Sequence, residues 1–486
     1  MPTIYVRTED CKQDIDLKEG ENIALALLRA GIKMPYSCGG KGSCKACLVW
    51  ISDSWQLACQ VYPKKDVRIE RFGWQNKEDK HSNIVGVEAN AAESYEAGRL
   101  VIAIDVGTTT LAAALVDCAS KAVLATASAT NSQQRYGLDV LSRIRSAVEG
   151  NEEELRQLIL QDIHNLLQQL MARTDDNGIE AIYVTGNTTM EHLIMGASLE
   201  TLGQAPFMPV FLTEQRLLID DIPLILLPGI SAFVGADIAA GIYASGMRQI
   251  EGPTLLLDLG TNGEMALKVK DKIYTTSAPA GPAFEGGNIS CGMGSVPGAV
   301  SKVRIVGKRA IISTIDAKPA IGICGTGVLE LLAELIDNKL IDETGRLTEP
   351  YQRQGYPFGR RADGTMLCFT QQDIREVQMA KAAIRSGIDL LVAEAGITLA
   401  ELEQVYLAGG FGYYLNVNKA VRIGLIPAEL ETKTKAAGNT ALEGCIAYAL
   451  NPMVREEVAG ICKVAEHMNL AEKADFEEQY LQYMKF

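Results

Sequence analysis

Four cysteines near the start of the chain have the residue type and the spacing of a metal-binding loop. They follow the pattern C-x5-C-x2-C-x11-C, at Cys38, Cys44, Cys47 and Cys59. The remaining cysteines are scattered singly in a chain with eleven in all, which argues against a secreted disulfide framework. Thiolates that converge from one glycine-rich loop bind metal, and the glycines let backbone amides turn toward it.

Two kinds of metal suit four cysteines. Tetrahedral zinc is one, but such sites usually pair two C-x2-C knuckles, and this loop has a single one. The other is a [2Fe–2S] cluster, and the spacing favours it. The loop resembles those of plant- and adrenodoxin-type ferredoxins, with Cys59 as the fourth ligand. It differs from them in a much shorter segment between Cys47 and Cys59.

A second set of residues has the pattern of a phosphate site. Asp105 is followed by Gly107, Thr108, Thr109 and Thr110, and the motif recurs as Asp258, Gly260, Thr261, Asn262 and Glu264. Glycine allows the backbone to approach a phosphate, and threonine offers hydroxyl and amide donors. An aspartate at a strand end holds Mg²⁺ through water. One D-x-G-T is a weak signal, whereas two copies that each follow an apolar strand are a strong one.

A third strand ends in a glycine pair, Gly409 and Gly410. With the two hairpins it resembles the phosphate-1, phosphate-2 and adenosine motifs of the acetate kinase/sugar kinase/Hsp70/actin superfamily. That resemblance implies ATP and Mg²⁺ in a cleft between two duplicated ribonuclease-H-like lobes. Asp105 and Asp258 would then position Mg²⁺ and the attacking water. Glu264 has two open interpretations, a carboxylate that orients water or a solvated strand residue.

The elements expected around these motifs define an α/β protein. Short strands and one helix capped by Asn22 predict a β-grasp-like [2Fe–2S] domain over residues 1–72. A polar stretch, 73–98, predicts a linker. Alternating strands and helices then predict the two-lobed ATP-binding domain over 99–486. Residues 456–483 are helix-prone with charges of both signs, and we expect a solvated helix there.

The fusion of the two modules resembles the reductive activators of corrinoid-dependent enzymes. Four further strings share that resemblance, at residues 135–140 with 142–144, 184–190, 279–287 and 438–444. The family implies an ATP-dependent, one-electron reduction of Co(II) to Co(I) in a corrinoid protein of a methyltransferase system. It also implies an upstream low-potential electron donor and a homodimer. Family members often carry a further domain in the middle, for which this chain has room only for a linker.

Three rival functions stay open at this point. A 2-hydroxyacyl-CoA dehydratase-type activator would bind a [4Fe–4S] cluster between subunits, for which Cys291 and Cys324 are candidates, although buried structural thiols fit both better. A small-molecule kinase with a redox-sensing ferredoxin domain is the second. A non-enzymatic electron carrier that uses nucleotide as a docking switch is the third.

The composition and net charge of the chain exclude several broad classes of protein. The 486 residues are 47% hydrophobic, which supports sizeable cores and excludes disorder as the main state. With 46 basic and 60 acidic residues the net charge is −14, so we expect no nucleic acid partner. No apolar leader opens the sequence and no run predicts a membrane span. The expectation is a cytoplasmic protein.

Overall fold

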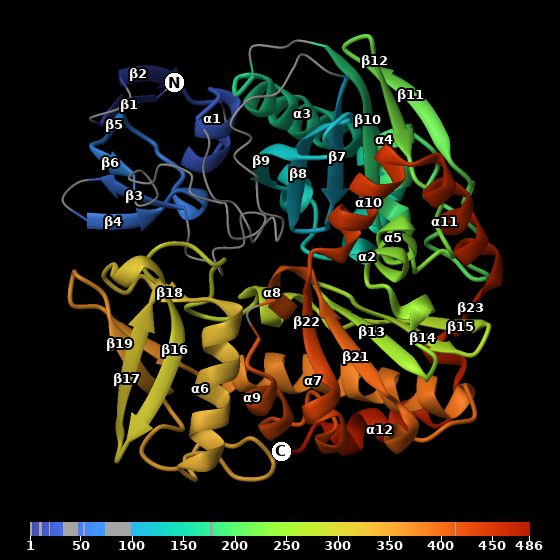
Figure 1. The fold of residues 1–486 in the computed structure, drawn as a ribbon. Helices are drawn as coiled ribbons and strands as arrows, with labels where there is room; N and C mark the ends of the chain where they lie inside the picture. Colours follow the sequence, from blue (N-terminus) through green and yellow to red (C-terminus); the bar gives the residue numbers. More distant parts are fainter. Residues whose placement is uncertain are drawn as a thin grey trace.

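The computed structural model describes residues 2–8, 12–18, 20–32, 47–51, 54–72, 99–174, 178–413 and 415–486. These residues form a small N-terminal unit and two larger lobes (Figure 1). Cys38 and Cys44, and the linker expected over 73–98, lie outside the described residues.

The N-terminal unit contains two three-stranded sheets and one helix. Its helix α1 (Ile23–Arg29) begins as expected at Asn22, whose side chain accepts a hydrogen bond from the amide of Leu25 at 2.9 Å. The sheet orders are β2-β1-β5 and β4-β3-β6, with β1 and β5 parallel. The strands are β1 (Thr3–Arg7), β2 (Lys12–Asp16), β3 (Leu48–Ile51), β4 (Ser54–Leu57), β5 (Val67–Ile69) and β6 (Arg71–Phe72). A mixed sheet with one helix over its apolar core is the expected β-grasp-like unit.

The first lobe is built on a six-stranded sheet in the order β11-β12-β10-β7-β8-β9. Strands β7, β8 and β9 form an antiparallel meander, and β10 and β12 run parallel to β7. Its strands are β7 (Leu100–Val106), β8 (Thr110–Asp117), β9 (Val123–Thr130), β10 (Ile179–Gly186), β11 (Gln215–Ile219) and β12 (Ile222–Leu226). Its helices are α2 (Val140–Ser146), α3 (Glu152–Met171), α4 (Thr188–Met195) and α5 (Ala236–Ala244).

The second lobe repeats this arrangement. Its sheet has the order β22-β21-β13-β14-β15-β23, with β13, β14 and β15 as the antiparallel meander and β21 and β22 parallel to β13. Its strands are β13 (Thr254–Leu259), β14 (Gly263–Val269), β15 (Lys272–Ala278), β21 (Gln404–Ala408), β22 (Thr434–Gly438) and β23 (Ala465–His467). The shared order of five strands confirms the duplicated fold that the repeated D-x-G-T motif predicts.

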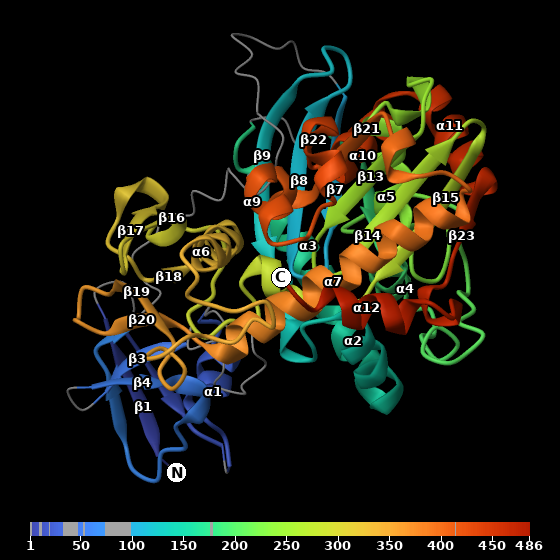
Figure 2. The ribbon, with the colours of Figure 1, turned by 90° about the horizontal axis from the view of Figure 1, so that it is seen from below.

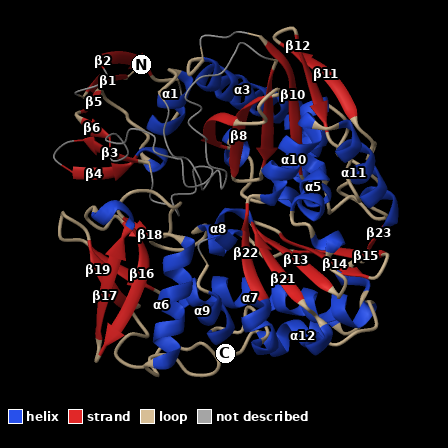
Figure 3. Ribbon diagram, in the orientation of Figure 1, coloured by secondary structure: helices blue, strands red, loops and turns tan. Residues whose placement is uncertain are grey.

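The apolar strands are covered on both faces, as near-continuous hydrophobic runs require. Helices α5 and α10 (Thr440–Leu450) lie between the two sheets (Figures 1 and 3). They share one core with both sheets, which includes Ala103 of β7 and Leu256 of β13. The outer face of the first sheet packs against α3 and α4. The long helix α7 (Gln371–Glu394) crosses the outer face of the second sheet (Figure 2).

A segment inserted in the second lobe adds a smaller sheet, β17-β16-β18, a two-stranded ladder and helix α6. Its elements are β16 (Ala299–Val306), β17 (Arg309–Thr314), β18 (Gly322–Ile323), α6 (Gly325–Asp337), β19 (Tyr356–Arg360) and β20 (Met366–Phe369). No helix within the described ranges is long and apolar enough to cross a membrane.

The prediction of a single solvated helix over residues 456–483 is wrong. The chain instead forms α11 (Pro452–Val464), then β23, then α12 (Phe476–Tyr483). Strand β23 pairs with β15, so backbone hydrogen bonding to the second sheet interrupts the helical pattern. Val458 and Ile461 of α11 are buried in the core between the lobes. Tertiary packing has therefore overridden the local preference for helix.

Candidate functional site

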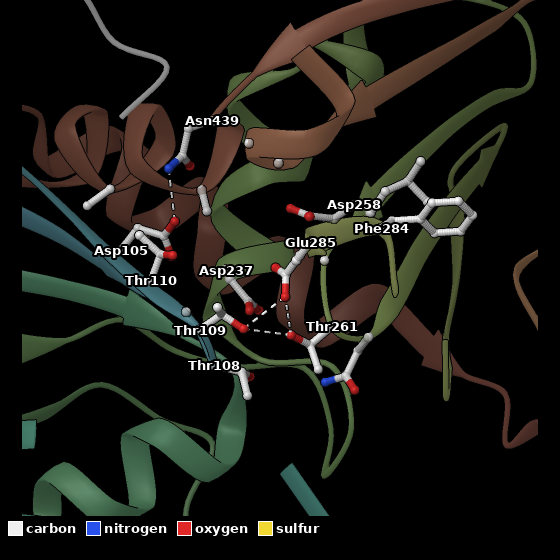
Figure 4. A pocket seen from close by; sticks show the side chains of 18 of the residues that line it. Asp105, Thr108, Thr109, Thr110, Asp237, Asp258, Thr261, Phe284, Glu285 and Asn439 are labelled. Atoms are coloured by element: carbon white, nitrogen blue, oxygen red, sulfur yellow. Dashed lines mark hydrogen bonds between the residues drawn. The ribbon is translucent and has the colours of Figure 1, made fainter. Parts of the chain in front are cut away.

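The two D-x-G-T hairpins face each other across the cleft between the lobes (Figure 4). The Oγ1 atoms of Thr109 and Thr261, 152 residues apart in sequence, are 2.9 Å from each other. All the residues predicted for the nucleotide site line this one cleft: Asp105, Gly107, Thr108, Thr109, Thr110, Asp258, Gly260, Thr261, Asn262, Glu264, Gly409 and Gly410.

The first turn has a closely supported backbone. A Cβ on Gly107 would lie 2.6 Å from the carbonyl oxygen of Thr110, so only glycine fits there. Three side chains from the segment after β9 donate hydrogen bonds to three successive carbonyls of the turn. The pairs are Gly107 with Asn131 Nδ2 (2.9 Å), Thr108 with Arg143 Nη2, and Thr109 with Gln134 Nε2 (2.9 Å). The turn is therefore positioned before any phosphate arrives.

The glycine pair after β21 belongs to the same cleft. Gly409 opens the short helix α8 (Gly409–Tyr413) with a φ of +82°. A Cβ there would lie 2.6 Å from Oδ1 of Asp258, so glycine is required by both the backbone conformation and the close approach. The third motif thus packs directly on the carboxylate of the second hairpin.

Five carboxyl groups line the cleft: Asp105, Asp237, Asp258, Glu264 and Glu285. Burial raises the pKa of Asp105 to about 6, and it raises the pKa of Asp258 to about 8 with the help of the neighbouring carboxylates. Burial, reinforced by nearby carboxylates, also raises the pKa values of Asp237 and Glu264, that of Glu264 well above its ordinary range. So many buried acids in one place call for a cation as counter-charge.

Glu264 is buried in the cleft, which excludes its interpretation as a solvated strand residue. The β13–β14 register places it directly opposite Asp258, so both side chains extend from the same face of the sheet. It is 8% exposed, and its Oε1 is buried with no hydrogen-bond partner. A solvated strand residue would show neither property.

This chemistry fits Mg²⁺ held with a nucleotide. Carboxylates beside phosphate donors are the ligands such a complex uses, and the buried, unpartnered Oε1 of Glu264 leaves one acceptor available. Among the residues that the structure describes, no three His, Cys, Asp or Glu side chains stand close enough to hold a metal ion directly. In such a complex Asp105 and Asp258 would act through the waters that Mg²⁺ retains.

Asparagines tie the cleft to the helices around it. Asn439 caps α10 and donates from Nδ2 to Oδ2 of Asp105 at 2.9 Å. Asn187 caps α4 and donates from Nδ2 to Oγ1 of Thr108 at 3.0 Å. Each side chain thus satisfies a helix terminus and orients one hairpin residue at the same time.

Several residues that line or support the cleft were not predicted from the sequence. These are Asn131, Gln134, Arg143, Asn187, Asp237, Glu285 and Asn439. Arg143, Asn187, Glu285 and Asn439 belong to the four strings that carry the family resemblance, so a signal for them was present. Asp237 lies inside an apolar, Gly/Ala-rich stretch, and a charge in that setting was its one signal.

Two of the four predicted cluster cysteines come together at one end of the β3–β4 hairpin. Cys47 precedes β3, and its carbonyl accepts from the amide of Ala58 at 2.8 Å, beside Cys59. Both cysteines are buried. The Nε2 of Gln60 donates to Sγ of Cys59 at 3.6 Å, a contact that stabilises a thiolate or bound sulfide. The described part of the loop therefore fits a cluster.

Cys291 and Cys324 act as hydrogen-bond donors to backbone carbonyls. The Sγ of Cys291 donates to the carbonyl of Cys368 at 3.4 Å, and that of Cys324 donates to the carbonyl of Val300 at 3.3 Å. Burial raises the pKa of the Cys291 thiol. These are the properties of structural thiols rather than of metal ligands.

Comparison with known proteins covers the chain in three parts. Residues 7–64 match the 2Fe-2S iron-sulfur cluster binding domain family. Residues 100–250 match the RACo middle region, and residues 252–486 match the C-terminal domain of RACo, the ASKHA domain.

Similar proteins span most or all of the same length. The chain is 28% identical over 589 residues to the corrinoid activation enzyme RamQ of Eubacterium limosum, covering 98% of each chain. It is 28% identical to the [Co(II) methylated amine-specific corrinoid protein] reductase of Methanosarcina barkeri, covering 78% of this chain and 76% of that one. A solved structure, a reductive activator for corrinoid,iron-sulfur protein, superposes with a TM-score of 0.75 at 26% identity, over 99% and 98% of the two chains. The chain belongs to the family of reductive activators of corrinoid-dependent enzymes, in which a [2Fe–2S] ferredoxin domain is joined to an ASKHA ATPase domain.

Proposed function

We propose that this protein returns the cobalt of a corrinoid protein from Co(II) to Co(I) at the expense of ATP. One electron passes to the cobalt from a [2Fe–2S] cluster held by Cys38, Cys44, Cys47 and Cys59. The corrinoid protein belongs to a methyltransferase system and loses its activity when Co(I) is oxidised. The names of the relatives, which act on corrinoid proteins, support this assignment.

The positions of the cleft residues support a role for each of them. The hydroxyl and amide groups of Thr108, Thr109 and Thr261 would donate hydrogen bonds to the phosphates. Asp105, held by Asn439, and Asp258 would orient the metal's waters and the water that attacks the terminal phosphate. Mg²⁺ bound there would neutralise phosphate charge as the bond to the terminal phosphate breaks. Glu264 lies opposite Asp258 and would orient that water.

ATP is needed because the electron transfer is uphill. Plant-type clusters have potentials of roughly −400 mV, and formation of Co(I) requires a lower potential. For one electron, each ~59 mV uphill is a tenfold loss in the equilibrium. A conformational coupling of about 1–3 kcal/mol would offset roughly 40–130 mV. Closure of two lobes around nucleotide is a motion that can provide such coupling.

One observation carries the proposal above the others. Two duplicated hairpins meet across an acid-lined cleft, in a chain that also brings Cys47 and Cys59 to one end of a ferredoxin-like hairpin. A kinase needs no cluster, and a simple electron carrier needs no acid-lined phosphate site. The test is conversion of Co(II) to Co(I) in a cognate corrinoid protein with reductant, with and without Mg-ATP. Reduction that is indifferent to ATP would remove the coupling.

The same proposal includes the surroundings of the reaction. The electron enters from an upstream low-potential donor, the protein works in the cytoplasm, and it forms a homodimer. Anaerobic purification checks the core of this scheme, because a coloured preparation with two irons per chain is expected. Four or more irons per chain would favour a dehydratase-type activator. Molecular mass in solution checks the dimer.

A further inference from the structure

Glu285 occupies the point where the two phosphate hairpins meet (Figure 4). Its Oε2 accepts a hydrogen bond from Oγ1 of Thr109 at 2.8 Å and another from Oγ1 of Thr261 at 2.6 Å. Its Oε1 lies 3.7 Å from the position that a Cβ on Gly260 would take. One carboxylate therefore bridges the hairpins of both lobes and covers the glycine of the second.

The bridge formed by Glu285 uses the hydroxyl protons that a bound phosphate would need. A threonine hydroxyl carries a single proton. When Thr109 and Thr261 both donate to Glu285, neither has a proton left for another acceptor, and their own 2.9 Å contact has none either. The hydroxyls best placed to bind a phosphate are thus already engaged by an anion that the chain supplies itself.

The backbone beneath Glu285 is fixed, so its side chain is the part that can move. It ends the turn of residues Pro282–Glu285, whose Phe284 is 1% exposed in the core of the second lobe. The next residue, Gly286, has a φ of +81°, and a Cβ there would lie 2.5 Å from the carbonyl oxygen of Met293. The turn also packs against α6 and α7. Rotation about the side-chain bonds of Glu285 frees both hydroxyls without moving this turn.

We propose that Glu285 is a positioning residue that holds the two phosphate-binding threonines in the empty cleft and is exchanged for the terminal phosphate of ATP. This inference rests on the proposed function, because it requires ATP to bind between the hairpins. Before binding, the carboxylate links the lobes, and after binding the phosphate replaces it as the bridge. The two anions compete for the same donors and repel each other, so each nucleotide-binding event includes the displacement of Glu285.

The test compares nucleotide affinity in the full-length, cluster-containing protein by calorimetry. Glu285→Gln keeps the shape of the side chain but removes the charge. We expect it to bind Mg-ATP at least about tenfold more tightly than the parent protein, the ratio given by about 1.4 kcal/mol. Adenosine has no phosphate to compete for the threonines, so its affinity should stay the same. Equal or weaker ATP binding by Glu285→Gln would overturn the exchange.

A matched control separates this effect from a general loss of acidity. Glu443→Gln makes the same charge change on α10, close to the cleft but outside its lining. Its ATP affinity should differ less than about twofold from that of the parent, and an equal tightening in both variants would refute a specific role for Glu285.

The bridge itself has a separate readout. In the nucleotide-free state, Glu285→Ala should increase amide hydrogen exchange in the turns at 107–110 and 260–262, because both hydroxyls lose their acceptor. Unchanged exchange would contradict the bridge. If the parent protein binds no ATP at all, the proposed function fails and this inference fails with it, whereas normal ATP binding by the parent together with unchanged affinity in Glu285→Gln overturns this inference alone.

Discussion

At the scale of single residues, Arg143 shows how much of the site depends on side chains behind the hairpin. It is fully buried, and it donates to the carbonyls of Thr108 and Gly137 and to Oε1 of Gln133. Burial lowers the pKa of its guanidinium to about 9. Several hydrogen-bond acceptors surround the guanidinium and stabilise its charge. The hydrogen bond that it donates to the carbonyl of Thr108 fixes the backbone of the phosphate turn.

Removal of Arg143 should affect stability and nucleotide binding together. Arg143→Met leaves buried carbonyl groups without donors, at a cost of about 1–3 kcal/mol for each. We expect a lower free energy of unfolding in urea and weaker Mg-ATP binding, since the turn is no longer held. Arg145→Met, an exposed position on the same helix, is the control and should change neither. An Arg143→Met protein with normal ATP affinity would show that the turn positions itself.

We expect the buried carboxyl group of Asp258 to make the free energy of unfolding of the protein depend on pH. Because burial raises its pKa from 3.8 to about 8, the folded protein binds more protons than the unfolded chain between these values. The free energy of unfolding should therefore fall as the pH rises from about 4 to about 8. Each pKa unit is worth about 1.4 kcal/mol, so the loss is on the order of a few kcal/mol.

Urea unfolding of the nucleotide-free and Mg²⁺-free protein at several pH values measures this loss. Asp258→Asn cannot ionise and should have a flatter slope, whereas Asp271→Asn, on the exposed surface of the same lobe, should follow the parent. Parallel slopes for Asp258→Asn and the parent would contradict the argument.

At the scale of secondary-structure elements, the residue that caps the start of a helix can also contact a phosphate hairpin. Asn439 uses both ends of its amide: Oδ1 accepts from the amide of Leu442 at 2.9 Å, and Nδ2 donates to Asp105. Helix α10 lies between the two sheets, so this one side chain connects the central helix with the first hairpin. The cap and the contact with Asp105 are chemically separable.

Two substitutions separate them. Asn439→Ser keeps an N-cap acceptor but loses the amide donor, so we expect nearly normal thermal stability with reduced Mg-ATP turnover in the presence of the corrinoid protein. Asn439→Ala loses both groups and should also be less stable by about 1 kcal/mol. Equal turnover by Asn439→Ser and the parent would mean that Asp105 needs no partner from α10.

The same element scale explains what the sequence could predict. The hairpins were predictable because glycine, threonine and aspartate at a strand end form a local pattern. Glu264 could be named as a candidate, but its two interpretations stayed open, because burial of a strand residue depends on packing between distant segments. The contacts of Glu285 and Asn439 were not predictable, because those with Thr109 and Asp105 join segments 176 and 334 residues apart. Pairing of Ala465–His467 with β15 was hidden for the same reason.

At the scale of the whole molecule, the two halves of the chain do different work. The N-terminal unit has its own core and provides cysteines, and the two lobes provide the phosphate site. Neither half alone can drive an uphill one-electron reduction, since one lacks an energy source and the other lacks a carrier. The family resemblance therefore depended on reading both motifs in one chain.

This division of labour predicts a crossed result from two variants. Cys59→Ser removes one of the four proposed ligands and should lower the iron content while Mg-ATP still binds with the parent's affinity. Asp258→Asn should retain two irons per chain and the colour of the parent while it loses ATP turnover. Each substitution should abolish ATP-dependent formation of Co(I) on the corrinoid protein. The absorbance of Co(I) under anaerobic conditions measures this.

A mixture of the two purified variants stays inactive if both functions must lie in one chain. Recovery of Co(I) formation in the mixture would instead mean that cluster and ATPase cooperate between chains, as a functional dimer would allow.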